Sequence, residues 1–212
     1  MKLYNYFRSS AAYRVRIALN LKGLAYEYIA IQLTKGEQRG EAYLAMNAQA
    51  LVPTLVEDGR TLTQSLAIIE YLNERHPKPS LLPVTPGERA RVRAIALAIA
   101  CDIHPLNNLR VLRYLTHVLN VDENTKSAWY RHWIEIGLVA LEAQLANDAA
   151  TRAFCHGDEP TLADICLVPQ LANARRYAIA LDAYPTLLRV DGNCAQLAAF
   201  ADAAPERQPD AA

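Results

Sequence analysis

The sequence predicts two domains, a small α/β domain followed by an all-helical domain. Up to about residue 75, short apolar strands alternate with helices, whereas beyond residue 86 apolar residues recur almost entirely at helical intervals. Between these regions lies a proline-rich stretch without periodicity, which is typical of a domain boundary. We therefore expect domains at residues 1–78 and 87–212, joined by a linker at 79–86.

The α/β domain should be a small open sheet with helices packed on it. Apolar runs predict strands at residues 2–6, 26–31, 54–56 and 60–62. Helices are expected at 10–22 and 64–75, with a shorter helix between the second and third strands. The resulting βαβ and then ββα order is that of an open α/β sheet. In the first helix, Val15 and Ile17 to Leu19 can face the core, and we expect Arg14 and Arg16 to point outward.

The second domain should consist of long helices. Apolar residues at helical spacing predict one helix that Pro105 should bend: Val92, Ile95, Ile99, Ile103, Leu106 and Leu112. A second long helix is expected at 123–149, with further helices from Thr161 and from about Thr186. Thr161 and Asp164 have the spacing of a capping box, which is a folding feature, so we assign Asp164 no catalytic role.

The composition argues against several classes of partner. Lys and Arg together number 22, as do Asp and Glu, so no net field attracts nucleic acid or an anionic membrane. The longest apolar run, residues 94–101, is too short to span a bilayer, and the first strand begins without a signal-peptide pattern. The four cysteines lie in apolar contexts without metal-ligand spacing. We expect reduced core thiols, a cytoplasmic location and no metal site.

Two adjacent serines, Ser9 and Ser10, stand between the first strand and the first helix. Either hydroxyl can cap the helix by accepting a hydrogen bond from an N–H of the first turn. The helix N-terminus also has unused donors and positive dipole character, which favour an anion in front of it. A hydroxyl donor there can keep a thiolate ionised. On these residues alone, a plain N-cap and a thiolate-binding role both remain open.

The segment at residues 8–23, RSSAAYRVRIALNLKG, resembles the start of zeta-class glutathione transferases. Their pattern is Ser-Ser-Cys, an aromatic residue and Arg-Val-Arg-Ile-Ala-Leu, and this sequence departs from it at Ala11, where the family usually has cysteine. Further matching segments extend along the whole chain, at residues 52–55, 64–72, 81–83, 163–170 and 207–210. The resemblance implies a thioredoxin-like α/β N-terminal domain, an all-α C-terminal domain and glutathione as cofactor.

The resemblance also implies glutathione contacts in the first domain. A proline that opens a strand cannot donate to the sheet, and a cis bond at Val52-Pro53 would turn the backbone groups of Val52 outward. A trans proline at an edge strand is the alternative. The resemblance favours the cis form, with Val52 pairing with the cysteinyl part of glutathione. It places Gln64 and Ser65 at the γ-glutamyl end, although an ordinary cap by Ser65 or Thr63 is the simpler explanation.

Further contacts rest on the resemblance alone. Gln38 matches the position near the glycyl end, and Ala11 joins Ser9 and Ser10 among the expected contacts. His104 and Asn108 lie four apart, which predicts one shared helix face. They are either solvent-facing polar residues or match the family's Gln-Pro-x-x-Asn-Leu pattern, with His104 in place of glutamine.

Zeta-class enzymes include glutathione-dependent maleylacetoacetate isomerases and bacterial maleylpyruvate isomerases. In such a reaction a thiolate adds to an activated cis alkene, the former double bond rotates, and the thiolate leaves. The enzyme must ionise the thiol, hold a dicarboxylate and stabilise an enolate. Ser9 or Ser10 suits the first need. Arginines suit the others because guanidinium binds carboxylate in a bidentate fork: Arg8 and Arg176 are the main candidates and Arg110 is a third.

Alanine at position 11 argues that the attacking sulfur comes from glutathione. Three arginines suit a short diacid, so we expect isomerisation of maleylpyruvate to fumarylpyruvate in aromatic degradation. The alternatives are a maleylacetoacetate isomerase, a general glutathione transferase and, from a different class, a non-enzymatic module of this fold. The resemblance also implies a homodimer that pairs the first domain of one chain with the helical domain of the other. Trp129, Tyr130 and Trp133 offer apolar area for it unless they are internal.

Overall fold

The computed structural model describes residues 1–211, which form two compact units. The first unit combines Met1–Leu81 with the residues from Ala195 onward, and the second is Leu82–Cys194. We expected domains at 1–78 and 87–212 with a linker at 79–86. The difference lies mainly after residue 194, where the chain returns to the first unit and packs helix α9 (Ala198–Ala201) against helix α1 (Ser10–Leu21).

The first unit is the predicted α/β domain, built on a four-stranded sheet of order β2-β1-β3-β4. The strands are β1 (Lys2–Asn5), β2 (Glu27–Ala30), β3 (Thr54–Glu57) and β4 (Arg60–Thr63). Strand β1 runs parallel to β2 and antiparallel to β3, and β3 pairs with β4 in antiparallel register. The loop after β1 therefore leaves from the middle of the sheet.

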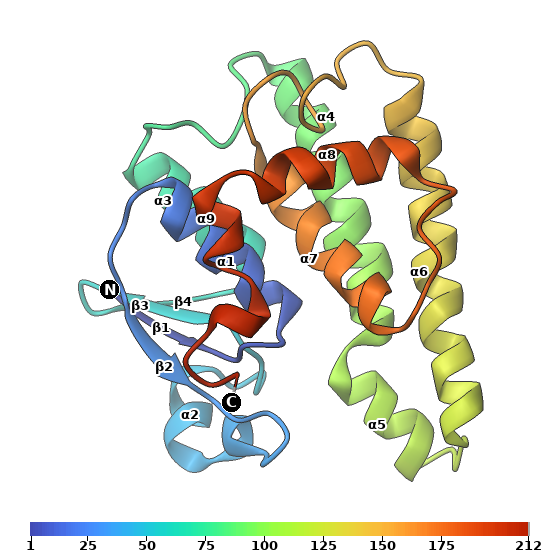
Figure 1. The fold of residues 1–212 in the computed structure, drawn as a ribbon. Coiled ribbons are helices and arrows are strands. Elements are labelled where there is room, and N and C mark those ends of the chain that lie inside the picture. Colours follow the sequence, from blue (N-terminus) through green and yellow to red (C-terminus); the bar gives the residue numbers. More distant parts are fainter. Residues whose placement is uncertain (212) are drawn as a thin grey trace. The chain divides into compact units, whose positions relative to one another are not determined.

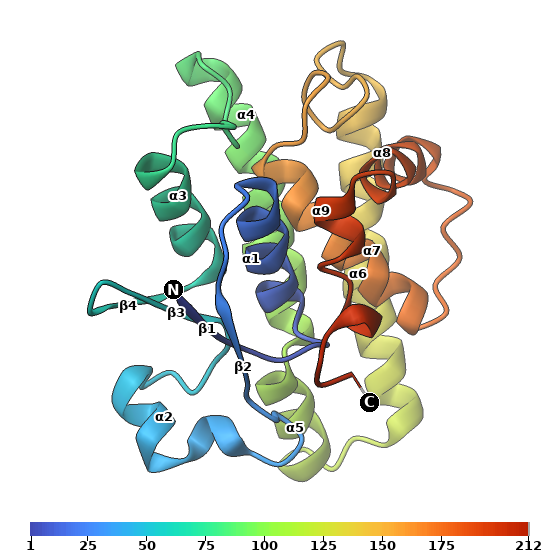
Figure 2. The ribbon, with the colours of Figure 1, turned by 60° about the vertical axis from the view of Figure 1, so that its left-hand side comes forward.

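Helices cover both faces of this sheet (Figures 1 and 2). Helices α1 and α3 (Ser65–Arg75) pack on one face, with α9 beside α1, and α2 (Glu41–Met46) lies on the other. Two short 3₁₀ turns, η1 (Glu37–Arg39) and η4 (Pro205–Arg207), complete the unit. These elements confirm the predicted thioredoxin-like arrangement.

Helix α1 differs from the prediction in one respect, because Arg14 and Arg16 do not point outward. Both are almost fully buried, with 1% and 0% of their surface exposed. The cause is that α1 is covered by the sheet, by α3 and by the returning chain. Arg16 donates to the carbonyl oxygen of Ala203, at 3.0 Å, and to the side-chain oxygen of Asn5. A buried guanidinium is tolerated only with such partners.

The second unit is helical, as predicted. It contains α4 (Pro86–Leu97), a π-helical segment η2 (Ala98–Ile103), a 3₁₀ turn η3 (His104–Asn107), α5 (Leu109–His117), α6 (Glu123–Ala146), α7 (Leu162–Arg176) and α8 (Pro185–Ala195). The single bent helix expected around Pro105 is instead divided into α4, η2, η3 and α5. The chain changes its winding at residue 98, before the proline, so a bend at Pro105 alone does not describe it.

Helix α7 forms the centre of this unit, since most of its residues are buried and it packs along α4. The predicted capping box is confirmed: Thr161 caps α7, and the Asp164 carboxylate accepts hydrogen bonds from the N–H groups of Thr161 and Cys155, each at 2.7 Å. All four cysteines are free, and Cys155, Cys166 and Cys194 are buried as expected. Cys101 is exposed, so the prediction of a core thiol was wrong there.

Candidate functional site

The loop between β1 and α1 carries the first group of candidate residues. Ser9 is the N-cap of α1, and its Oγ accepts a hydrogen bond from the N–H of Ala12 at 3.2 Å. Ser10 is buried in the first turn of the helix, followed by the half-buried Ala11. Ser9 is therefore the cap, and because its oxygen only accepts from Ala12, its own hydrogen remains available to a ligand.

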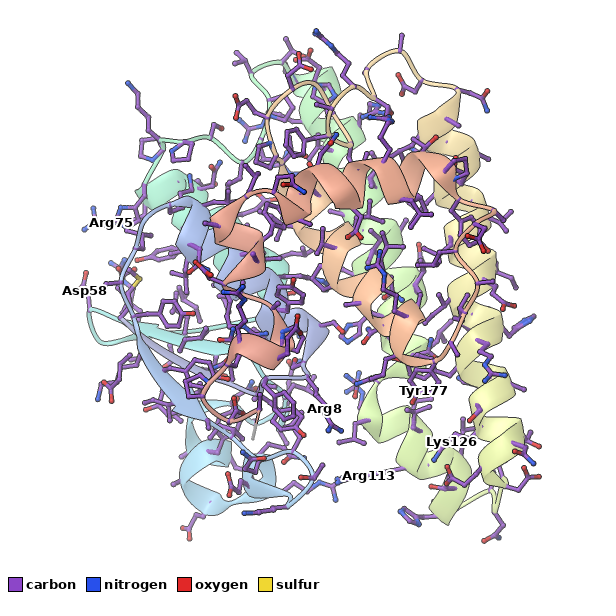
Figure 3. The ribbon with its side chains drawn as sticks, viewed as in Figure 1. Arg8, Asp58, Arg75, Arg113, Lys126 and Tyr177 are labelled. Carbon is purple, nitrogen blue, oxygen red and sulfur yellow. The ribbon has the colours of Figure 1, made fainter. Side chains whose placement is uncertain are left out.

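Arg8 is exposed and extends from the same loop (Figure 3). Its guanidinium lies over the ring of Phe7, with 4.9 Å between the guanidinium carbon and the ring centroid. This contact limits the directions that the long side chain can take. A cation and a hydroxyl donor thus stand next to each other at the N-terminus of α1.

The backbone before β3 offers a second binding element. The Val52-Pro53 peptide bond is cis. Val52 itself is buried in a hydrophobic cluster with Tyr6 and Tyr43. Within residues 1–211, no hydrogen bond joins the backbone N–H or C=O of Val52 to another group. This residue therefore has a donor and an acceptor ready for an extended peptide-like ligand.

The N-terminus of α3 provides a third element. Its N-cap, Gln64, has φ +68°, which is rare for a residue with a side chain, and neither Ser65 nor Thr63 caps the helix. The Nε2 of Gln64 donates to the Oε1 of Gln49 at 2.8 Å. In the part of the chain that the structure describes, no side chain caps this helix, so its first-turn N–H groups can bind an anion.

Arg14 was missed as a candidate because we expected it to face solvent. Its guanidinium donates to the Oγ of Ser65 at 3.4 Å and so brings a buried positive charge to the start of α3. The sequence gives little indication that Arg14 is buried, because an arginine on an amphipathic helix is usually solvated. Gln38, in η1, is also buried, and its Oε1 has no hydrogen-bond donor among the described residues.

In the second unit, the structure separates His104 from Asn108 instead of placing them on one helix face. His104 begins the 3₁₀ turn η3, whereas Asn108 is the N-cap of α5 and accepts a hydrogen bond from the N–H of Arg110 at 3.1 Å. The change of winding at η2 and η3 breaks the four-residue spacing that the prediction assumed. Arg110 is exposed in the first turn of α5.

Arg176 is the last residue of α7 and is held by two tyrosines. Its guanidinium donates to the Tyr130 hydroxyl at 3.1 Å and lies 5.3 Å from the ring centroid of Tyr177. The rings of Tyr130 and Tyr177 stack at 3.5 Å, and Figure 3 shows Tyr177 just beyond α7. Burial raises the pKa of Tyr130 to about 12, so its hydroxyl keeps its proton at neutral pH.

Arg175 has a different environment. It forms an ion pair with the carboxylate of Asp191, so its charge is compensated within the helical unit. Among residues 1–211 there is no cluster of three or more His, Cys, Asp or Glu side chains placed to hold a metal ion. In the same range, no helix is long and apolar enough to cross a membrane.

Comparison with known proteins places these features in a family. Residues 3–80 match the glutathione S-transferase N-terminal domain, and residues 128–203 match the glutathione S-transferase C-terminal domain. The chain is 50% identical to the maleylpyruvate isomerase of Ralstonia sp over the full length of both. It is also 50% identical to a probable maleylacetoacetate isomerase of Vibrio cholerae, over 99% of this chain and 97% of that protein.

Solved structures agree with this assignment. The holo structure of a maleylpyruvate isomerase described as a bacterial zeta-class glutathione S-transferase matches with a TM-score of 0.98 at 50% identity, covering both chains fully. A maleylacetoacetate isomerase from Anaeromyxobacter dehalogenans, with dicarboxyethyl glutathione and citrate in its active site, matches with a TM-score of 0.88 at 51% identity. It covers 100% of this chain and 97% of that one. The chain belongs to the glutathione S-transferase family, with zeta-class members among its relatives.

Proposed function

We propose that this protein is a glutathione-dependent isomerase that converts a maleyl keto acid into its trans isomer. Maleylpyruvate, converted to fumarylpyruvate in aromatic degradation, is the favoured substrate. The observation that carries the proposal is the N-terminus of α1, where Ser9 keeps a hydroxyl hydrogen to donate and position 11 is alanine. This place is suited to stabilising a thiolate but supplies no sulfur, which a bound thiol must therefore provide.

The residues in the first unit fit glutathione. The unpaired backbone groups of Val52 suit the cysteinyl residue of a tripeptide, next to the cis bond at Pro53. The uncapped start of α3, with Gln64, Ser65 and the buried charge of Arg14, suits the γ-glutamyl carboxylate. The buried Oε1 of Gln38 lacks a donor among residues 1–211 and can accept a hydrogen bond from the N–H of the glycyl residue. His104 and Asn108 are further proposed contacts from the second unit.

Bound glutathione supplies a thiolate that adds to the cis alkene and leaves again after the former double bond has rotated. Ser9, with the N–H groups around Ser10 and Ala11, favours the ionised form of the thiol. Arg8 adjoins Ser9 and is proposed to stabilise the negative charge that develops on a substrate oxygen. Arg176, oriented by Tyr130, is proposed to bind the distal carboxylate, with Arg110 in a lesser role.

The proposal is tested by an absorbance assay of purified, dialysed protein with maleylpyruvate and with maleylacetoacetate. Turnover should require glutathione in catalytic amount, and glutathione should be recovered unchanged. Maleylacetoacetate is the second candidate substrate, because several relatives at 50% identity carry that isomerase name. Full activity without any thiol would overturn the mechanism, and consumption of glutathione would favour a general transferase.

The roles of the arginines predict separate kinetic effects. Arg8→Met should lower mainly kcat, whereas Arg176→Met should raise mainly KM, each costing on the order of 2–4 kcal/mol in kcat/KM. Arg110→Met should have a smaller effect. Near-normal kinetics for both Arg8→Met and Arg176→Met would contradict the proposed roles.

The proposal includes a homodimer in which the helical unit of one chain pairs with the first unit of the other. The aromatic residues first considered for this role are used internally: Tyr130 is buried, and Trp129 donates to the carbonyl oxygen of Leu106. Two other apolar stripes are exposed. They are Ala90, Ala94, Leu97 and Cys101 on α4 and η2, and Ile136, Val139, Ala140 and Ala143 on α6.

Segments η2 and α6 pack against each other, with Gly137 directly against Ile103, so the two stripes lie on neighbouring elements. Such an exposed apolar surface supports association. Light scattering should give a dimer mass, and Ile136→Glu should give a monomer, whereas Val84→Glu, at an exposed position before α4, should not. The four free cysteines support a cytoplasmic location as part of the same proposal.

A further inference from the structure

The loop that carries Arg8 and Ser9 is held by a residue 203 positions further along the chain than Phe7. The backbone N–H of Phe7 donates to Oδ2 of Asp210 at 3.2 Å. The other carboxylate oxygen of Asp210 accepts a hydrogen bond from the Tyr28 hydroxyl, which comes from β2. Asp210 thus connects the loop to the edge strand of the sheet.

The carbonyl groups of the same loop are held by Arg16. Its guanidinium donates to the carbonyl oxygen of Phe7 at 3.1 Å and, at 3.4 Å, to that of Tyr6. Together, Asp210 and Arg16 bind both backbone groups of Phe7, two residues before Ser9. The backbone in front of the N-cap is therefore fixed from two sides.

The charges around this loop are balanced inside the first unit. Burial lowers the pKa of Arg16, and Tyr28, Tyr26, Tyr13 and Asp210 act in the opposite direction. Burial and then the hydrogen bond to Asp210 raise the pKa of Tyr28, so its hydroxyl remains a donor. The Asp210 carboxylate thus accepts from two donors and lies near the Arg16 guanidinium.

The segment that presents Asp210 is itself anchored to α1. The Nε of Arg16 donates to Ala203, and the side chain of Asn20 donates to the carbonyl oxygen of Ala199 at 3.1 Å. The side-chain amide of Gln208 closes the turn by donating to the carbonyl oxygens of Asp202 and Ala204, both at 2.8 Å. The carboxylate is held in place by these contacts and is not on a loose tail.

We propose that Asp210 is a positioning residue that acts through the Phe7 amide and orients Ser9 and Arg8 toward the bound thiol. The inference rests on the proposed function, because it assigns Asp210 to the same glutathione site. Asp210 itself touches neither reactant. Its removal should leave the helix cap in place but let the loop in front of it move.

The test compares Asp210→Ala, Asp210→Asn and Tyr28→Phe with a matched control, Asp202→Asn. Asp202 lies on the same returning segment, but its carboxylate is exposed and pairs with Arg207. Two properties are measured: amide hydrogen exchange of residues 7–9 without glutathione, and the pKa of the bound glutathione thiol from its thiolate absorbance.

In Asp210→Ala, exchange at the Phe7 amide should rise on the order of tenfold. The thiol pKa should rise by about one unit, and kcat should fall more than KM changes. Asp210→Asn and Tyr28→Phe should have intermediate effects because each keeps an acceptor for Phe7, and the control should match wild type.

Unchanged exchange in Asp210→Ala would overturn the inference, as would faster exchange with an unchanged thiol pKa. If Asp210→Ala fails to fold, the same criteria apply to Asp210→Asn. A wild-type protein that binds no glutathione would instead overturn the proposed function, while the exchange result would still report on the loop.

Discussion

The Arg176 guanidinium and the Tyr130 hydroxyl are joined by a 3.1 Å hydrogen bond between the end of α7 and the N-terminal third of α6. Because Tyr130 also stacks on Tyr177, the two tyrosines restrict Arg176 to few rotamers. A long cationic side chain that is held in this way loses less entropy when it binds a carboxylate.

Tyr130→Phe should therefore raise KM for the keto acid about fivefold, as expected for one lost hydrogen bond of about 1 kcal/mol. The dissociation constant of glutathione should stay the same. Steady-state kinetics and calorimetry check both expectations. Tyr184→Phe is the control, because Tyr184 is buried in the same unit but lies outside this hydrogen bond. An equal effect of the two variants would mean that Tyr130 acts only through packing.

Substitutions at Ser9 separate its two roles. Ser9→Ala removes both the cap of α1 and the donor, whereas Ser9→Asp restores a cap but cannot donate to a thiolate. Both should slow turnover by roughly 10-fold to 100-fold, which corresponds to about 1.5–3 kcal/mol. Only Ser9→Ala should also lower the free energy of unfolding, by about 1 kcal/mol. Thermal unfolding and thiolate absorbance distinguish these results. Full activity of Ser9→Asp would mean that Ser9 acts only as a helix cap.

The positive φ of Gln64 gives a prediction about strain. Gln64→Gly should fold at least as stably as Gln64→Ala, because glycine adopts φ +68° without the strain of about 1–3 kcal/mol that a side chain brings there. Both variants should bind glutathione more weakly, since they lose the side-chain amide. Chemical denaturation and calorimetry measure the two quantities. Lower stability of the glycine variant would contradict the strain argument.

Asp164 should matter for folding and not for chemistry. Asp164→Ala leaves the buried N–H groups of Thr161 and Cys155 without an acceptor and should lower the free energy of unfolding by about 2–4 kcal/mol. Urea denaturation measures this change. Asp158→Ala, at an exposed ion pair with Arg152, should change stability by less than about 0.5 kcal/mol. The KM of any properly folded Asp164 variant should be that of wild type.

Asp148 predicts how stability depends on pH. Its hydrogen bond from Arg91, and then that from the Ala150 N–H, lower the pKa of the Asp148 carboxyl. A group with a lower pKa in the folded state stabilises it above the unfolded pKa, and this contribution disappears as the pH falls through the folded pKa. Asp148→Asn should therefore be less stable than wild type at pH 7, and the difference should shrink in acid. A difference that is constant with pH would contradict this.

Local patterns in the sequence predicted most of the fold. The capping box at Thr161 and Asp164 could be read because its partners are three residues apart, and the strands and helices of the first unit follow from periodicity. The burial of Arg14 and Arg16 could not be predicted in this way. The residues that cover them, such as Ala203, lie almost 190 positions away, and an arginine on a helix gives no local sign of such a partner.

For the candidate site, too, local sequence patterns predicted the elements but not the contacts between distant residues. Ser9, Val52 and Gln64 were found because each lies at the start of a helix or strand, where the local sequence is informative. The prediction that His104 and Asn108 share a helix face was wrong, because no residue type in the sequence indicates the change to π-helical and 3₁₀ winding around Pro105. Asp210 was part of a matching segment, yet its contact with Phe7 depends on the chain's return to the first unit.

The return of residues 195–211 to the first unit has a consequence for synthesis on the ribosome. The strands and helices up to Leu81 emerge first, but the loop before Ser9 lacks Asp210 until the whole second unit has been made. At about 5–20 residues per second this delay is on the order of 10 s. During that time the nascent α/β unit exposes the face of α1 that α9 later covers, which is where a chaperone should bind it.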